Sequence, residues 1–188
     1  MRVTSTTVLP VLVPVHDDRQ LDEQPLDEFL GNLAVGYTVG PPFGERVLSW
    51  ADLDRMGVSH RVIRRAATDT LDAMLDRARL HGQPPALMLS FDGLESSVLL
   101  ADAFWDSLEG SIPGELVVGV PARDVVIVTG SESRPGLEKA RRAVDRVFFA
   151  GGEYLLTRHL LVRRRGEWGV FRPQVPRQRM HPASGRLH

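Results

Sequence analysis

Apolar residues recur along this chain at two spacings, each of which predicts its own kind of element. A spacing of about 3.6 residues predicts three long amphipathic helices, at residues 59–81, 92–109 and 135–150. Alternating or continuous apolar runs predict strands at residues 8–15, 33–39, 46–48, 86–91, 116–120, 125–129, 160–165 and 168–171. This order favours an α+β fold, with a mixed or mainly antiparallel sheet built from hairpins and three long helices packed on it.

Two features place particular strands within the predicted sheet. Pro10 and Pro14 lack the backbone N–H that a central strand must donate, so the first strand is expected at a sheet edge. Residues 116–120 and 125–129 are apolar throughout and lose the alternation of a half-buried strand. They are therefore predicted to form a central hairpin, with its tip at residues 122–124.

Two pairs of polar residues at i,i+3 spacing predict helix starts. Ser49 and Asp52 have the spacing of a capping box, in which each side chain accepts a hydrogen bond from the other residue's backbone. They predict a short helix that ends at Gly57. Asp92 and Glu95 repeat the spacing and predict the start of the helix at residues 92–109.

The apolar pattern also suggests how the chain is divided. Residues 1–172 are predicted to form a single α+β domain, and residues 173–188 a basic Pro/Arg tail without an apolar period. Residues 17–28 are acidic and polar and are predicted to be a solvated loop. Phe104 and Trp105 lie on the apolar side of the helix at residues 92–109, so both are expected in the core.

The composition narrows the class of protein. The chain has 188 residues, of which 43% are hydrophobic and 25% charged, as in an ordinary globular protein. It contains no cysteine, which excludes disulfides, thiolate catalysis and cysteine-ligated metals. No apolar run approaches the roughly 20 residues of a membrane helix, and the first residues lack a signal-peptide pattern. We therefore expect a soluble cytoplasmic protein without a membrane partner.

Charge is divided unevenly along the chain. The net charge is −1, yet residues 1–133 carry 10 Arg and 20 Asp or Glu, while residues 134–188 carry 12 Arg, one Lys and 4 Asp or Glu. The two parts either neutralise each other across one fold, which is the interpretation we favour, or leave a basic surface for nucleic acid or an acidic partner.

Several short runs together resemble a known bacterial family. They are 9–12 (LPVL), 33–39 (LAVGYTV), 52–53 (DL), 57–59 (GVS), 91–97 (FDGLESS), 102–105 (DAFW), 114–121 (GELVVGVP), 124–127 (DVVI) and 148–152 (FFAGG). On these runs the chain resembles the uncharacterised YtpQ-like family, a domain of unknown function. The resemblance implies a soluble bacterial fold and assigns no activity, cofactor or site.

Four polar residues are the best candidates for acid–base chemistry or for binding an anionic ligand. Asp92 and Glu95 could act as an acid–base pair at a helix start, although helix capping explains the same spacing. Arg123 and Asp124 stand at the predicted hairpin tip, where both could face an anion, although turn chemistry explains the Asp. The histidines have no metal-ligand spacing and there is no Gly-rich phosphate loop, so neither a metal nor a cofactor is expected.

The C-terminal part carries the strongest hint of nucleic-acid binding. Arg163, Arg164 and Arg165 are close in sequence to Trp168, and basic residues near an aromatic ring can hold phosphates and stack a base. The sequence pI of about 6.6 is far below that of a dedicated nucleic-acid binder, and Trp168 also fits a core position. Nucleic acid is therefore not the expected partner.

No catalytic constellation stands out, and each polar cluster has a structural explanation. The sequence accordingly favours a non-enzymatic protein-interaction or accessory module whose partner is another protein. The first alternative is a small acid–base enzyme or anionic-ligand-binding domain that uses Asp92, Glu95, Arg123 and Asp124. The second alternative is nucleic-acid binding through the basic C-terminal part.

Overall fold

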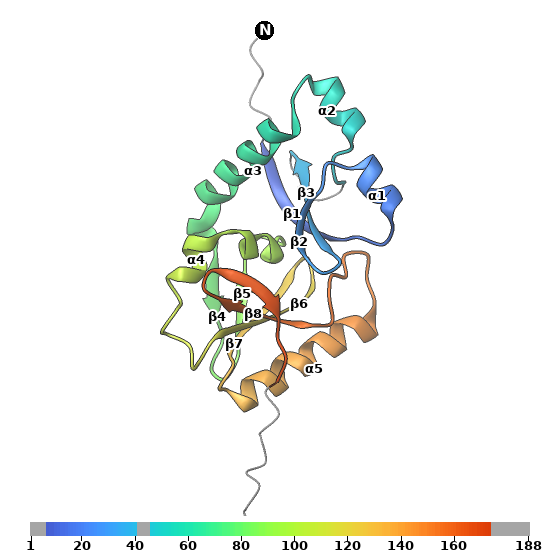
Figure 1. The fold of residues 1–188 in the computed structure, drawn as a ribbon. Coiled ribbons are helices and arrows are strands. Elements are labelled where there is room, and N and C mark those ends of the chain that lie inside the picture. The colour runs from blue at the N-terminus through green and yellow to red at the C-terminus, as the bar shows by residue number, and fades with distance from the viewer. Residues whose placement is uncertain (1–6, 41–45, 174–188) are drawn as a thin grey trace, which may run out of the picture.

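The computed structural model describes residues 7–40 and 46–173, and in this part of the chain the strands form two antiparallel sheets (Figure 1). The smaller sheet has the order β1-β3-β2, with β1 (Val8–Pro14), β2 (Asp27–Leu30) and β3 (Leu33–Val39). The larger sheet has the order β4-β5-β7-β6-β8-β9, with β4 (Arg79–His81), β5 (Leu87–Ser90), β6 (Leu116–Ala122), β7 (Val125–Gly130), β8 (Leu160–Arg164) and β9 (Glu167–Val170). The α+β class is confirmed, with the strands divided between two sheets where the sequence predicted one.

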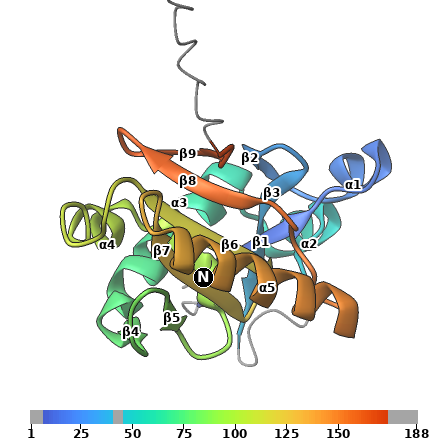
Figure 2. The same ribbon diagram turned by 90° about the horizontal axis from the view of Figure 1, so that it is seen from below.

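Helices cover these sheets from several sides. The α-helices are α1 (Asp18–Glu23), α2 (Trp50–Met56), α3 (His60–Met74), α4 (Asp102–Asp106) and α5 (Arg134–Ala150), and the 3₁₀ helices are η1 (Leu75–Arg77) and η2 (Glu95–Leu100). Helix α3 packs on β1, and α5 packs along β6 and β7 (Figure 2). Of the helices in the described part of the chain, none has both the length and the apolar character that crossing a bilayer requires.

Both strand predictions based on special features are confirmed. β1 is an edge strand of its sheet, as its prolines predicted. β6 and β7 are the two central strands of the larger sheet and pair with each other. The pairing of Ala122 with Val125 leaves Arg123 and Asp124 as the two residues of the turn.

The helix predicted at residues 59–81 is too long. Helix α3 ends at Met74, and after η1 the backbone of Ala78 becomes extended, with φ −65° and ψ 129°. Residues 79–81 then pair with β5 as strand β4. The apolar pattern continues across this change, because Ala78 is buried in the same core as α3, so periodicity alone does not mark the boundary.

The helix predicted at residues 92–109 is also wrong as a single element. The chain forms η2, breaks at Ala101 and continues as the short helix α4. In η2 the run from residue 95 to residue 99 is buried on every side, and η2 packs against both β1 and β7. A segment that joins two sheets in this way has no water-facing side, so a one-sided helix pattern does not describe it.

The start of the chain departs from the prediction in two further places. The predicted solvated loop at residues 17–28 contains helix α1, capped by Asp17, and the first residues of β2. Residues 46–48 are not a strand, although the Leu48 N–H donates to the Tyr37 carbonyl at 2.8 Å. The capping box of Ser49 and Asp52 is confirmed at the start of α2.

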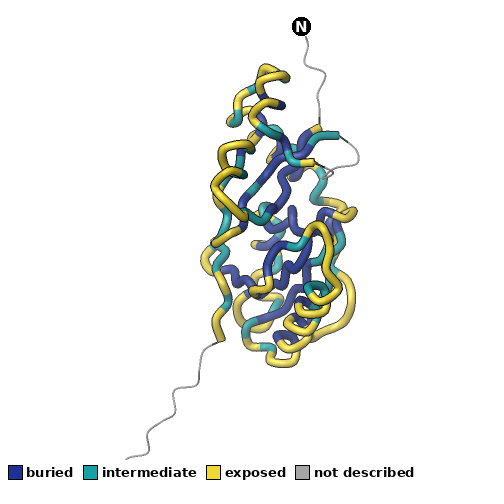
Figure 3. Tube along the Cα trace, turned by 90° about the vertical axis from the view of Figure 1, so that its right-hand side faces the viewer, coloured by how far each residue is buried: buried dark blue, intermediate teal, exposed yellow. Residues whose placement is uncertain are grey.

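The core connects the two sheets. Buried residues run through the strands of both, while exposed residues lie over the helices and turns (Figure 3). The largest cluster includes Leu9 and Val11 of β1 together with Trp105 of α4, and a second lies between α5 and the larger sheet. Helix α5 approaches closely because Gly119 has no side chain: a Cβ there would stand 2.9 Å from a methyl group of Val144.

Candidate functional site

The structure brings two of the four predicted acid–base residues to one place. Glu95 begins η2, Arg123 forms the tip of the β6–β7 hairpin, and the Ser96 N–H donates to the Arg123 carbonyl at 2.8 Å. Glu95 is 6% exposed and Arg123 is 9% exposed. The junction is thus buried and held by backbone hydrogen bonds.

The buried carboxylate of Glu95 stabilises the turn before η2. Its Oε1 atom accepts the backbone N–H groups of Phe91 at 2.8 Å and Gly93 at 3.2 Å. Oε2 is buried and has no hydrogen-bond partner among the described residues, and the same holds for the hydroxyls of Ser96 and Ser97. The contacts that Glu95 makes are those of a structural group.

Asp92 and Glu95 do not form the predicted capping box. Asp92 has a φ of 52°, η2 begins without a side-chain cap, and Glu95 accepts from the turn instead. The Asp92 side chain is 64% exposed and forms an ion pair with Arg77 at 3.4 Å. The prediction was wrong because the chain enters a tight left-handed turn here, which the i,i+3 spacing does not reveal.

Arg123 and Asp124 also differ in their surroundings. The Arg123 guanidinium lies 4.0 Å from the ring centroid of Tyr154, and burial lowers the pKa of Arg123. Asp124 is exposed at the turn. Since Glu95 and Arg123 are buried while Asp92 and Asp124 are exposed, the four side chains do not present one common reactive surface.

The basic C-terminal strand is largely engaged within the protein. The Arg163 side chain is 1% exposed and donates to Asp102 at 3.1 Å, Asp106 at 2.6 Å and Glu109 at 2.8 Å. Arg164 forms a bidentate ion pair with Glu115, with N–O distances of 2.7 and 2.9 Å. These carboxylates belong to the acidic first part of the chain, which agrees with internal neutralisation.

Trp168 is engaged as well. Its indole N–H donates to the Leu99 carbonyl at 2.9 Å, and its ring lies against that of Trp105. The remaining member of the predicted basic group, Arg165, stands at the β8–β9 turn with a φ of 52°. The nucleic-acid alternative needs a row of unpaired arginines beside an accessible indole ring, and residues 163–168 do not provide this combination.

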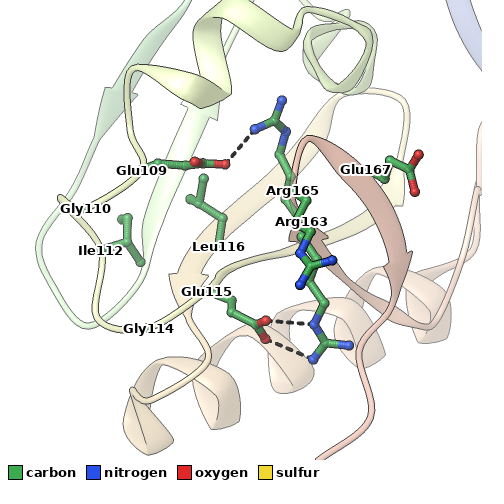
Figure 4. A pocket seen from close by; sticks show the side chains of 10 residues that line it. Glu109, Gly110, Ile112, Gly114, Glu115, Leu116, Arg163, Arg165 and Glu167 are labelled. Carbon is green, nitrogen blue, oxygen red and sulfur yellow. Dashed lines mark hydrogen bonds and ion pairs between the residues drawn. The ribbon is translucent and has the colours of Figure 1, made fainter.

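A cavity of about 670 Å³ opens beside this strand (Figure 4). Its lining contains equal numbers of acidic and basic residues, namely Glu109, Glu115 and Glu167 and the three arginines 163–165. Two of the three arginines already have carboxylate partners in its wall. The cavity lining therefore has no excess of charge, and of its six charged residues only Arg165 and Glu167 form no ion pair with another described residue.

A cluster that the sequence did not predict joins β2, β3 and α3. The Asp27 carboxylate accepts hydrogen bonds from the Tyr37 hydroxyl and the Arg64 guanidinium, and His60 Nε2 lies 3.2 Å from Asp27 Oδ2. Burial and the bond to Asp27 raise the pKa of Tyr37. A cavity of about 370 Å³ borders Asp27, Tyr37 and Arg64.

This cluster ties α3 to the smaller sheet. The Asp27 carboxylate accepts from both donor groups, and the His60 ring also contacts the rings of Tyr37 and Trp50. These contacts give the cluster a structural role. The residues come from positions up to 37 apart, and no local motif marked them. Within the described residues, no group of three or more His, Asp or Glu side chains is placed to hold a metal ion.

Comparison with known proteins identifies relatives of unknown activity. A UPF0354 protein of Listeria innocua is 29% identical over 130 residues, which cover 67% of this chain and 48% of that protein. A UPF0354 protein of Staphylococcus aureus is 23% identical over 142 residues, which cover 72% of this chain and 50% of that protein. The chain thus spans about half the length of the curated relatives it matches.

These relatives confirm the predicted family resemblance, because YtpQ is the Bacillus name for the same uncharacterised bacterial family. No protein-family model and no solved structure matches the chain. The relatives' names state no substrate, partner or activity.

Proposed function

Because the chain is a relative of the UPF0354 proteins, whose name states no activity, we propose its function from its own surface: a non-enzymatic protein-interaction module. In this proposal residues 1–172 act as one domain in the bacterial cytoplasm. The outer face of α5 is the binding surface, and the partner is a protein that presents acidic side chains around an apolar pocket.

The observation that carries the proposal is the exposure of Phe149. This side chain is 95% exposed near the end of α5, whereas the neighbouring Phe148 is partly buried against the core beneath α5. Burying a phenylalanine side chain on binding is worth about 1.5–3 kcal/mol. Aromatic residues and arginine are the types enriched at the centres of protein interfaces.

Arginines extend the same face of α5 from this ring. Arg142, Arg146 and Phe149 are spaced i, i+4 and i+7, which places them along one side of the helix. Glu138 forms its ion pair with Arg134, at 3.1 Å, and not with Arg142. Among the described residues, Arg142 and Arg146 form no ion pair.

The charge of the helix favours an acidic partner over a second copy of this chain. Helix α5 carries five basic residues and two acidic ones. Two such faces brought together would repel each other, while opposite charges across an interface speed association and select the partner. A partner with carboxylates around a hydrophobic pocket would match both Phe149 and the arginines.

The enzyme alternative has less support. Its four residues are divided between a buried junction and an exposed surface, and Glu95 is occupied by backbone amides. The nucleic-acid alternative loses Arg163, Arg164 and Trp168 to contacts within the protein. These contacts leave the outer face of α5 as the stronger candidate.

The test uses the full chain as bait in a lysate of the producing bacterium, followed by mass spectrometry and by binding measurements with each purified candidate. Capture alone decides nothing. A true partner should bind Phe149→Ala and Arg146→Glu at least about tenfold more weakly, a loss of about 1.4 kcal/mol. Binding should also weaken as the salt concentration is raised, because salt screens the attraction between the solvent-exposed arginines and the acidic groups of the partner.

Val62→Ala is the matched control, since Val62 is also an exposed apolar residue, at 54%, but lies on α3. It should leave binding unchanged. Thermal unfolding must show that all three variants remain folded. Partners that bind every α5 variant as tightly as the unmodified protein would overturn the proposal.

A further inference from the structure

A further cavity is also lined by the Glu115–Arg164 ion pair. Its volume is about 610 Å³, within the usual range for small-molecule sites. It shares Gly114, Glu115 and Arg164 with the cavity of Figure 4 and is otherwise formed by the first half of α5, the turn before it and the chain after β9. Three separate segments thus meet around one hollow.

Arginine dominates the charged lining of this second cavity. Four arginines, 134, 141, 164 and 172, face two acidic residues, Glu115 and Glu132. Arg164 is held by Glu115, and Arg134 by Glu138 from outside the cavity lining. In the described part of the chain neither Arg141 nor Arg172 forms an ion pair, so two guanidinium groups remain for a ligand.

The contrast with the neighbouring cavity is one of charge rather than size. There three arginines face three glutamates, so its lining has no net formal charge. Here the lining has an excess of two positive charges. Guanidinium groups bind carboxylate and phosphate oxygens in pairs of parallel hydrogen bonds, so the excess favours an anion with several oxygens.

Two further features support a small organic anion. Leu137 and Phe171 contribute apolar surface to the lining, which would contact the carbon skeleton of such a ligand. The lining also includes residues at the N-terminal end of the 17-residue helix α5, where the helix dipole adds positive potential. The dipole strengthens a site that the arginines already define.

We propose that this cavity binds a small anion carrying two or more carboxylate or phosphate groups, with Arg141 and Arg172 as its main ligands. The ligand would sit between α5 and the residues after β9 and would connect them. This inference does not depend on the proposed protein partner, because Phe149 and Arg146 are not part of the cavity lining.

The site is tested by isothermal titration of the full chain with inorganic pyrophosphate and, separately, with citrate. Both probes should bind at low salt with dissociation constants below about 1 mM, a modest affinity for a polar site. Arg141→Gln and Arg172→Gln should each weaken binding about tenfold or more, and the double variant should abolish it. Binding of one probe alone would still support the site and would restrict its ligand to phosphate or to carboxylate groups.

Arg142→Gln provides the matched control. It removes the same charge from the neighbouring residue of α5, outside the cavity lining, and should leave both affinities unchanged. An equal loss in Arg142→Gln would mean that the probes respond only to the general charge of the helix and would overturn the proposal. So would the absence of heat for both probes with a protein that is folded by circular dichroism.

Discussion

The indole rings of Trp105 and Trp168 lie edge to face, with centroids 5.2 Å apart and planes at 88°. Each ring also donates its N–H to a carbonyl of η2: Trp105 to Val98 at 2.7 Å, and Trp168 to Leu99 at 2.9 Å. The pair therefore fastens η2, which contacts both sheets, to α4 on one side and to the last hairpin on the other.

Trp105→Ala should lower the free energy of unfolding by about 3–5 kcal/mol, because the side chain is fully buried and its removal leaves a cavity and takes one hydrogen bond from the Val98 carbonyl. Urea unfolding followed by circular dichroism measures the loss. Trp50→Ala is the control, since Trp50 is 40% exposed and should cost far less. A loss below about 1 kcal/mol for Trp105→Ala would contradict the described packing.

Arg163 stabilises the last hairpin through its buried stem and its three carboxylate partners. Arg163→Ala should cost about 2–4 kcal/mol, because it removes buried methylene groups and leaves three like charges without their shared cation. Arg163→Met keeps the volume and should cost less. Asp102→Asn should cost under about 1 kcal/mol, because the Asp102 side chain is 73% exposed.

The ordering of these three variants in chemical denaturation is the decisive result. If Asp102→Asn were as destabilising as Arg163→Ala, the exposed carboxylates would contribute more than surface pairs do. If Arg163→Met were as destabilising as Arg163→Ala, the lost charge rather than the lost packing would account for the effect. Either result would contradict the expectation that the buried stem of Arg163 contributes more to stability than its exposed carboxylate partners do.

Because of Asp52, the free energy of unfolding should decrease at acidic pH. Hydrogen bonds from the Arg46 guanidinium and from the Ser49 backbone lower the pKa of the buried Asp52 carboxyl. On acidification the Asp52 carboxyl is therefore protonated at a higher pH in the unfolded chain than in the folded protein. The stabilisation that the ionised carboxylate provides is complete above about pH 4 and is lost as the pH falls below that value. At neutral pH, Asp52→Asn should cost about 1–2 kcal/mol, as losing a helix cap does.

Urea unfolding at neutral pH and at about pH 3 compares the two proteins, and the difference between them should shrink in acid. Asp54→Asn is the control, because Asp54 lies in the same helix but is exposed. A difference between the unmodified protein and Asp52→Asn that stayed constant down to low pH would show that the charge of Asp52 contributes nothing.

Nucleic acid should not bind appreciably. Arg163, Arg164 and Trp168 are committed to contacts within the fold, so a labelled single strand should show no saturable binding in fluorescence anisotropy at low salt. Micromolar binding that weakened about a hundredfold or more near 0.2 M salt would show that other arginines of the protein hold the strand and would reverse this interpretation, since each neutralised phosphate releases counterions.

The central hairpin and helices α3 and α5 could be predicted from the sequence, because the pattern of buried positions within each of these elements is visible over a few neighbouring residues. Residues 116–120 and 125–129 needed to be apolar on both sides, and α3 and α5 needed one water-facing side. The apolar pattern did not predict the structure of segments that pack between two surfaces. The pairing of β4 with β5 and the packing of η2 against β1 and β7 select strand or 3₁₀ geometry over a continued helix.

The same limit applies to the candidate sites. The sequence favoured mutual neutralisation of an acidic part and a basic part over a free basic surface, and Arg163 and Arg164 do pair with residues 102–115. Which charges meet was decided by the tertiary structure, as it was for Asp27, whose partners lie on other elements. The reason is physical: local spacing determines which face of an element a residue occupies, whereas its partner depends on which element packs against that face.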